Sequence, residues 1–371
     1  MPPMIDRRLF LAAGAATALI PPAARAATDE DALDRLLRQV PVINGNLVAP
    51  FDDAAPLDAE TAAQVRASGL TAFKMTIGGP SGGYDDVNAD ILAFDKAIGM
   101  SAGVYMKITR PEDFETARRT GAVGVIYSFE AADMLGEDVA RIDHFAAMGV
   151  RVMQLSYNTA SPFASGVMVP QPSTGLTELG RAAVARMNAT GVTLDLSHAD
   201  EPSSLAAVAA STRPVAITHA GCASVYAHPR NKSDAVLRAV ADKGGVVGLY
   251  ELGYISPGPG QQSMDDYLAH LLRALSVCGE DHVGIGSDAL LTPFDTSPES
   301  MAQWNASIEA RRVAGVAAPG EGRPPFVEGL NRPDRCAVIA RALLDRGQPI
   351  RVVEKVLGAN FLRVFSETWA V

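Results

Sequence analysis

The sequence is poor in cysteine. It has three, Cys222, Cys278 and Cys336, and they are widely spaced. An odd number at such wide spacing predicts neither a disulfide framework nor a cysteine-rich zinc site. We interpret Cys278 and Cys336 as small buried apolar residues. Cys222 follows His219 by three residues, and its role is left open.

Basic residues are also scarce. There are 32 lysines and arginines against 42 aspartates and glutamates, a formal net charge of −10. A nucleic-acid-binding protein needs a basic face, so this balance argues against a nucleic-acid partner. The acidity otherwise indicates solubility and does not identify a substrate.

No apolar run after the first 26 residues is long enough to suggest a mature membrane span. Near the N-terminus, Arg7-Arg8 precedes the apolar run "LFLAAGAATALI", and Ala24-Arg25-Ala26 follows as an A-x-A cleavage site. The run is too short to cross a bilayer as a mature helix. We predict a twin-arginine signal peptide over residues 1–26, cleavage near Ala26 and a periplasmic protein.

The remaining chain, residues 27–371, alternates short apolar segments with amphipathic helical ones. Such alternation predicts a single α/β domain, a (β/α)8 TIM-type barrel, with a doubly wound open sheet as the alternative. Two helices are expected to close the chain. The segment 293–329, rich in proline and glycine, is interpreted as a lid or an oligomer contact. The expected strands are residues 40–45, 70–78, 122–130, 151–158, 192–198, 214–220, 245–252 and 281–288.

Polar residues stand where the expected strands end. The active sites of such barrels lie at the carboxyl ends of the strands. Imidazole and carboxylate groups are ligands that suit zinc, so these ends predict a metal site. Arg230, after the sixth strand, has the planar fork that binds carboxylates. We interpret His144, His270 and His282 as structural. The residues at the strand ends are Asn44, Asn46, Glu130, Tyr157, His198, His219 and Asp288.

Several segments occur in an order that resembles a known family. They are "SFEAAD", "LSYN", "DLSHAD", "THAGCASVYAHPRNKSD", "HVGIGSD" and "LGANFLRVF". Together they resemble the membrane (renal) dipeptidase family of zinc peptidases in the amidohydrolase superfamily. The resemblance implies a (β/α)8 barrel in which a glutamate bridges two zinc ions. It also implies hydrolysis of dipeptides, including those with a D-residue at the C-terminal side, and a homodimer.

The resemblance assigns roles to five residues. Glu130 matches the bridging carboxylate, and His198 and His219 match the two histidines of one zinc ion. Asp288 matches the aspartate that touches the other zinc and handles the proton of the attacking water. Arg230 matches the residue that holds the carboxylate of the substrate.

The first strand departs from the family pattern. The resemblance implies a histidine and an aspartate as metal ligands where this chain has Asn44 and Asn46. An asparagine offers only a neutral oxygen and a non-basic nitrogen, so we expect one zinc ion rather than two. The two amides are expected to hydrogen-bond a substrate or a water. Tyr157 falls near a family histidine that contacts the scissile carbonyl, and its phenol can donate a hydrogen bond to an oxyanion.

The leading hypothesis is therefore a periplasmic single-zinc hydrolase of dipeptides or similar small amides. Two alternatives remain open: a lyase, isomerase or lactonase on the same scaffold, and a non-catalytic member that binds small carboxylates or peptides. Restoring the missing ligands, by Asn44→His with Asn46→Asp, is expected to raise the zinc content to two.

Overall fold

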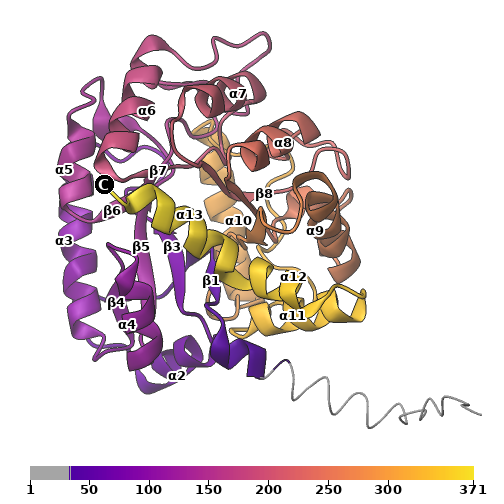
Figure 1. Ribbon diagram of the computed structural model, residues 1–371. Coiled ribbons are helices and arrows are strands. Elements are labelled where there is room, and N and C mark those ends of the chain that lie inside the picture. The colour runs from indigo at the N-terminus through magenta and orange to yellow at the C-terminus, as the bar shows by residue number, and fades with distance from the viewer. Residues whose placement is uncertain (1–32, 34) are drawn as a thin grey trace, which may run out of the picture.

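The computed structural model describes residue 33 and residues 35–371 (Figure 1). The predicted signal peptide, residues 1–26, and its cleavage near Ala26 lie outside the described residues, so they stay predictions. Among the residues that are described, no helix is both long and apolar enough to cross a membrane.

A curled parallel sheet forms the centre of the molecule. Its two end strands are joined by a parallel bridge between Asp195 and Ala216, and the Leu196 amide donates to the Ala216 carbonyl at 2.8 Å. The eight strands therefore run round a closed ring, and the predicted (β/α)8 barrel is confirmed. In ring order they are β7 (Thr193–Leu194), β6 (Val150–Met153), β5 (Val123–Phe129), β3 (Ala72–Thr76), β1 (Ile43–Asn44), β10 (Val283–Ile285), β9 (Val246–Leu249) and β8 (Ala216–Ala220).

These strands fall inside the eight predicted segments, except that β6 begins one residue earlier, but three other strands were missed. β4 (Tyr105–Lys107) pairs with the first half of β5, and β6 pairs with its second half. β4 is only three residues long and partly exposed, so its pattern is too short to recognise. β2 (Leu47–Val48) and β11 (Ala289–Leu290) pair in parallel just after β1 and β10. They extend the chain beyond the carboxyl ends of the barrel strands.

Helices surround the barrel (Figure 1). Several begin at a side chain that caps the free backbone amides of the first turn, such as Thr177, Ser233 and Ser263. The helices before the last strand are α2 (Ala59–Ala67), α3 (Tyr84–Met100), α4 (Glu112–Thr120), α5 (Arg141–Ala147), α6 (Glu178–Thr190), α7 (Glu201–Ala210), α8 (Asp234–Asp242) and α9 (Met264–Cys278), with the short turns η1 (Asp133–Leu135) and η2 (Gly253–Ile255).

The chain ends in α11 (Arg335–Asp345), α12 (Ile350–Glu354), η3 (Lys355–Ala359) and α13 (Asn360–Trp369). The last three were predicted as one helix, which is broken at Gly358. A Cβ at Gly358 would lie 2.4 Å from the Pro41 carbonyl oxygen, so only glycine lets the chain pass this close to β1. Phe361 then packs into one end of the barrel, where a Cβ on Gly284 would lie 2.6 Å from its ring.

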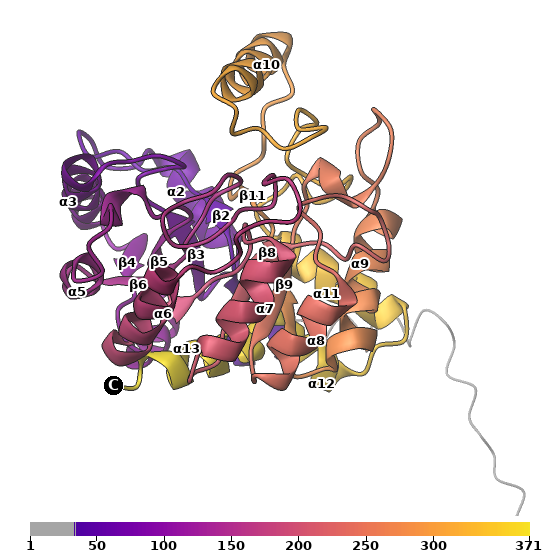
Figure 2. The same ribbon diagram turned by 90° about the horizontal axis from the view of Figure 1, so that it is seen from above.

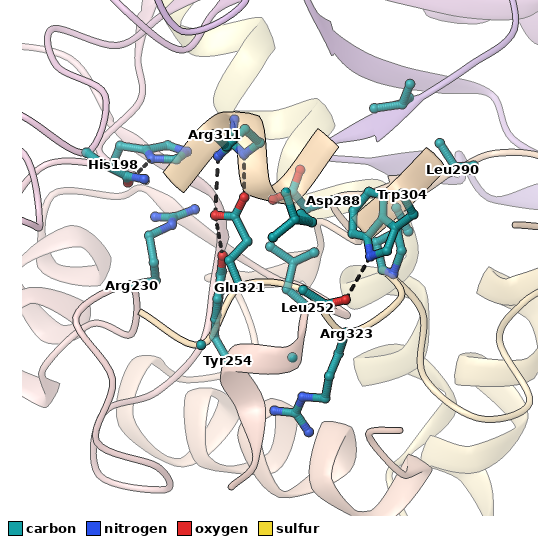
Figure 3. A pocket seen from close by; sticks show the side chains of 18 of the residues that line it. His198, Arg230, Leu252, Tyr254, Asp288, Leu290, Trp304, Arg311, Glu321 and Arg323 are labelled. Carbon is teal, nitrogen blue, oxygen red and sulfur yellow. Dashed lines mark hydrogen bonds and ion pairs between the residues drawn. The ribbon is translucent and has the colours of Figure 1, made fainter. Parts of the chain in front are cut away.

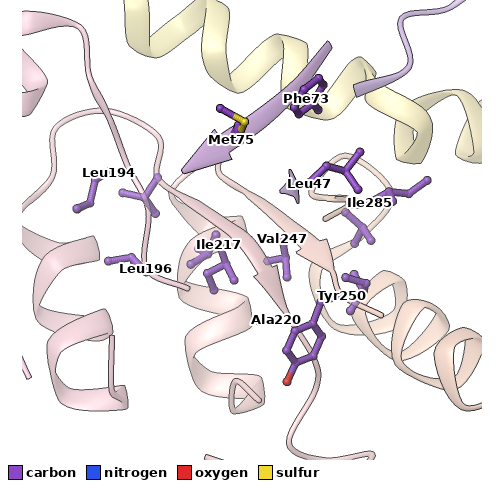
Figure 4. Packing of buried hydrophobic residues seen from close by; sticks show 14 of the residues in the cluster. Leu47, Phe73, Met75, Leu194, Leu196, Ile217, Ala220, Val247, Tyr250 and Ile285 are labelled. Atoms are coloured by element: carbon purple, nitrogen blue, oxygen red, sulfur yellow. The ribbon is translucent and has the colours of Figure 1, made fainter. Parts of the chain in front are cut away.

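The larger of two apolar clusters fills the space between the strands and the helices. Figure 4 shows part of it, with Ile217, Val247 and Ile285 on neighbouring strands. These side chains are fully buried. The packed interior and the aromatic residues of α13 leave the carboxyl ends of the strands as the open face of the barrel.

The predicted excursion at 293–329 contains a helix, α10 (Pro298–Val313). Figure 2 shows α10 raised above the end of the barrel at which β2 and β11 lie. The excursion therefore stands over the open face, where the residues at the strand ends gather.

Candidate metal centre

Three of the predicted ligands meet at one point. Glu130 follows β5, His198 follows β7, and His219 lies on β8. One ligand atom from each lies within 4.8 Å of the others. The two Nε2 atoms are 3.1 Å apart, and the Glu130 carboxylate lies 3.9 Å from His198 Nε2 and 3.8 Å from His219 Nε2. Separations of this size suit atoms that share one zinc ion at bonds of about 2.0–2.2 Å.

The other nitrogen of each imidazole is held by a neighbour. His198 Nδ1 lies 2.8 Å from the side-chain oxygen of Asn158, and His219 Nδ1 lies 2.9 Å from the Thr218 hydroxyl. Such partners orient a ligand ring and leave Nε2 for the metal. Burial lowers the pKa of both histidines well below the usual value, so both rings are neutral, as metal binding requires.

A buried lysine, which the sequence interpretation missed, lies beside Glu130. Lys74 lies on β3, with no side-chain exposure, and its Nζ is 3.2 Å from Glu130 Oε1. Burial by itself would raise the pKa of Glu130, but the charge of Lys74, together with smaller contributions from neighbouring groups, outweighs it and the pKa falls to about 2. A signal was present, since a lysine inside the apolar strand "LTAFKMTIG" needs a buried partner.

The two asparagines bond to protein groups. Asn46 donates from Nδ2 to Glu130 Oε1 at 2.9 Å and to Asp288 Oδ1 at 2.8 Å, and its Oδ1 accepts from Lys74 at 2.9 Å. Asn44 donates to the Ser287 hydroxyl at 2.8 Å and accepts from the Ser287 amide at 3.0 Å. Neither amide lines the cavity described below. The residues of this first position therefore do not fit a metal ion.

Asp288 borders the same cluster. Its Oδ2 lies 4.0 Å from His219 Nε2, and its backbone adopts a left-handed conformation with φ 52°. Burial, and then the charge of Glu130, raise the pKa of Asp288 to about 7. A carboxyl group of this pKa can take up and release a proton near neutral pH.

A cavity of about 300 Å³ opens from the metal cluster. Figure 3 shows its polar side, with His198, Arg230 and Asp288, and the apolar Leu252 and Leu290 nearby. The excursion supplies much of the wall, which the sequence interpretation did not resolve into residues. Its contributors include Trp304, Ile308, Arg311, Glu321 and Arg323.

Arg230 lies in this cavity with its side chain almost fully buried. Its Nη1 donates to the Ser197 carbonyl. Within the part of the chain that the structure describes, its Nη2 has no hydrogen-bond partner. A buried guanidinium with a free N–H is a strong donor for an anionic ligand, because charged hydrogen bonds are the stronger kind.

Tyr157 stacks on His198, with ring centroids 4.1 Å apart. Its hydroxyl accepts a hydrogen bond from Arg311 Nη2 at 3.0 Å, and Arg311 is in turn paired with Glu321. Burial, and then the charge of Glu130, raise the pKa of Tyr157 to about 12. The phenol therefore keeps its proton at neutral pH and can donate it in a hydrogen bond.

The sequence is similar to those of a known peptidase family. The family model described as membrane dipeptidase (Peptidase family M19) matches residues 31–313. A relative named an uncharacterized dipeptidase, from Schizosaccharomyces pombe, is 28% identical over 258 residues, which are 68% of this chain and 54% of that protein. The chain thus spans about half the length of that relative.

Solved structures share the fold. An amidohydrolase from Pseudomonas aeruginosa is 28% identical with a TM-score of 0.78, covering 91% of this chain and 99% of that one. A dipeptidase described as a metallopeptidase of family M19 is 20% identical with a TM-score of 0.71, covering 90% and 99%. At this identity, the second likeness shows the fold alone.

Proposed function

This chain belongs to the membrane dipeptidase family, and from that premise we propose that it is a metal-dependent hydrolase of dipeptides or similar small amides, with one zinc ion. The observation that carries the proposal is the cluster of Glu130, His198 and His219. Three protein ligands with a further position open to water are typical of catalytic zinc sites. When bound, zinc supplies a water of lowered pKa and a Lewis acid for the carbonyl.

Asp288 is proposed to move the proton. Its carboxylate borders the cluster, 4.0 Å from His219 Nε2, and lines the cavity. It takes the proton of the attacking water and gives it to the leaving amine. A pKa of about 7 favours both the uptake and the release of this proton, since the group can act as a base and as an acid at neutral pH.

Two further residues are proposed to hold the substrate. The free Nη2 of Arg230 binds the terminal carboxylate of a dipeptide, which fixes the scissile bond relative to the metal cluster. Tyr157 donates its hydroxyl proton to the oxygen that becomes negative in the transition state. The apolar wall of Leu252, Leu290 and Ile308 suits a hydrocarbon side chain.

The location of the enzyme is part of the proposal. The twin-arginine pattern at Arg7-Arg8 and the A-x-A site before residue 27 support export of a folded protein to the periplasm. Twin-arginine export of a folded, metal-loaded chain agrees with a resident zinc ion. The homodimer implied by the resemblance stays a prediction.

The test is hydrolysis by protein that has been stripped of metal and then reloaded with zinc. A panel of L,L-, L,D- and dehydro-dipeptides is incubated with each form, and the released amino acid is measured. We expect release only after zinc is restored, and none from a His219→Asn variant. Equal rates from the stripped protein would contradict the proposal. Zinc and dipeptide binding without any release would instead support the non-catalytic alternative.

A further inference from the structure

The environment of Lys74 is unusual for a lysine. The residue lies between the apolar Phe73 and Met75 on β3, and its side chain has no exposure. Taking an ammonium group out of water is unfavourable unless charged or polar partners replace the water. Its Nζ does have such partners: Asn46 Oδ1 at 2.9 Å, Glu130 Oε1 at 3.2 Å and Asp195 Oδ2 at 4.0 Å.

Of these partners, Asp195 also accepts hydrogen bonds from neighbouring residues on both of its oxygens. Its Oδ1 accepts from the Ser197 hydroxyl at 2.6 Å and from the Thr218 amide at 3.0 Å. Its Oδ2 accepts from Gln154 at 3.1 Å and from the Thr218 hydroxyl at 2.6 Å. Asp195 is thus held by neutral donors, and Lys74 is the cation nearest to it. The ammonium therefore lies between two carboxylates, as a metal ion would.

The two nearest partners of Lys74 occupy the positions that the family resemblance assigns to the first metal ion. That ion would need the side chain at position 46 and an oxygen of the shared glutamate. Here Asn46 Oδ1 and Glu130 Oε1 both accept hydrogen bonds from Nζ. Asn46 Nδ2 also donates to Glu130 Oε1. This oxygen is therefore occupied by two donors.

The same contacts fix the carboxylate of Glu130 beside the two imidazoles. Its Oε2 lies 3.9 Å from His198 Nε2, and its Oε1 lies 3.8 Å from His219 Nε2. Lys74 and Asn46 both donate to Oε1, which sets the orientation of the whole carboxylate. Lys74 thereby acts as a positioning residue for a metal ligand and touches none of the reacting atoms.

We propose that the ammonium group of Lys74 is a built-in cation that takes the place of the first metal ion of the family. A divalent ion beside Asn46 and Glu130 would lie almost against Nζ, and two cations at that separation repel each other strongly in a buried site. The inference rests on the proposed function in one respect, the use of Glu130, His198 and His219 by a single zinc ion. It changes the expectation drawn from the sequence, because restoring the ligands at positions 44 and 46 is no longer sufficient for a second ion.

The experiment compares zinc content in two variants. One carries Asn44→His with Asn46→Asp and keeps Lys74. The other adds Lys74→Met, which removes the charge and keeps most of the length of the side chain. Each protein is loaded with zinc, freed of excess metal, and analysed for zinc per chain by elemental and native mass spectrometry.

We expect the first variant to hold no more zinc than the unsubstituted chain and the second to gain one ion per chain. The matched control adds Lys107→Met to the first variant instead. Lys107 is a lysine of β4 that pairs with Asp95, away from the cluster. This control is expected to gain no zinc.

A gain of zinc while Lys74 is still present would overturn the inference. So would the absence of a gain in the Lys74→Met combination, provided that its circular dichroism and thermal transition show a folded protein. If that combination does not fold, Lys74→Gln in the same background provides the same comparison with a polar side chain. This experiment tests the inference through the difference in zinc content between variants. The proposed function is tested separately, by zinc-dependent hydrolysis in the unsubstituted chain.

Discussion

The site has two halves that differ in what their side chains can bind. The histidine half is formed by Glu130, His198 and His219, and the asparagine half by Asn44, Asn46 and Lys74. Both stand at the carboxyl ends of barrel strands. In the histidine half, neighbours bind the outer ring nitrogens and the two Nε2 atoms face each other at 3.1 Å. In the asparagine half, the amides bond to Ser287, Glu130, Asp288 and Lys74.

This difference indicates that metal binding depends on lone pairs that no other group occupies. Polar residues at the end of a strand are not sufficient to bind a metal. Asn44 joins β1 to the loop after β10 through its two bonds with Ser287, so it has become part of the framework. Asn46 turns its N–H groups, which cannot bind a metal, toward the two carboxylates. Both halves are built on strands of the same barrel, and they differ in the chemistry of their side chains.

The largest effect is expected when the histidine half is made to resemble the asparagine half. His219→Asn replaces a basic nitrogen by a neutral amide, so zinc content should fall from one per chain to near zero. Because zinc supplies several kcal/mol of transition-state stabilisation, kcat/KM for a dipeptide should fall by about 10⁴-fold. Metal analysis and steady-state kinetics check both values. His144→Gln, on α5, is the control and should change neither.

Asp288 lies where the two halves meet, and Asp288→Asn separates proton transfer from metal binding. The amide can still accept a hydrogen bond from Asn46 but cannot take a proton. We expect kcat to fall by about 10³-fold, in the usual range for a general base, with zinc content unchanged. A variant that loses its zinc would show that Asp288 is needed as a ligand, as the family resemblance implies for the other ion.

A substitution of Arg230 tests how the site binds its substrate. Arg230→Met removes the free Nη2, so KM for dipeptides should rise by about 10²-fold through loss of a charged hydrogen bond. A dipeptide amide lacks the carboxylate and should be hydrolysed at similar rates by both proteins. The control is Arg323→Met, which changes another arginine of the cavity wall. An equal loss for both substrates would point to a structural role for Arg230.

The smallest effect concerns the stability of the metal-free protein. The pKa of Asp288 is raised to about 7, so the folded state holds a proton that the unfolded chain releases near pH 4. The contribution of this group is complete below pH 4 and is lost as the pH rises through 7. By itself this group therefore lowers the free energy of unfolding between pH 5 and pH 8, by on the order of 1 kcal/mol. The buried His198 and His219 act in the opposite direction, because their lowered pKa values make the folded state less stable as the pH falls below 6.5.

The difference in the free energy of urea unfolding between the unsubstituted chain and Asp288→Asn should therefore change from pH 5 to pH 8, whereas a constant difference would count against the raised pKa. Glu130 acts with the opposite sign. Its pKa is lowered to about 2, so its contribution is complete above pH 4.5 and disappears only as the pH falls toward 2. Between pH 5 and 8 this difference therefore reports on Asp288, because Glu130 does not titrate there and the histidines are common to both proteins.

Sequence patterns located much of this site because barrel topology is regular. Alternating apolar strands and helices bring the ends of β5, β7 and β8 to one face, and Glu130, His198 and His219 followed from that rule. Lys74 was missed because it sits inside an apolar run, where its partners come from other strands. Its contacts depend on the order of the strands in the sheet, and the sequence of one segment does not give that order.

The excursion above the barrel was harder still. Its proline- and glycine-rich sequence predicted a lid or an oligomer contact, but no periodicity indicates which residues turn inward. Arg311 meets Tyr157 across 154 positions of sequence, a contact that only the fold reveals. Likewise, the break at Gly358 depends on the close approach of Pro41 and was not visible as a change in helical pattern.

In the proposed site, one half holds a zinc ion and the other half holds Lys74. The most direct measurement is the zinc content of the unsubstituted chain after loading with excess zinc and removal of free metal. We predict one zinc ion per chain, and none in the matched His219→Asn variant. Two ions per chain would contradict the assignment of the asparagine half, and no bound zinc would contradict the assignment of the histidine half.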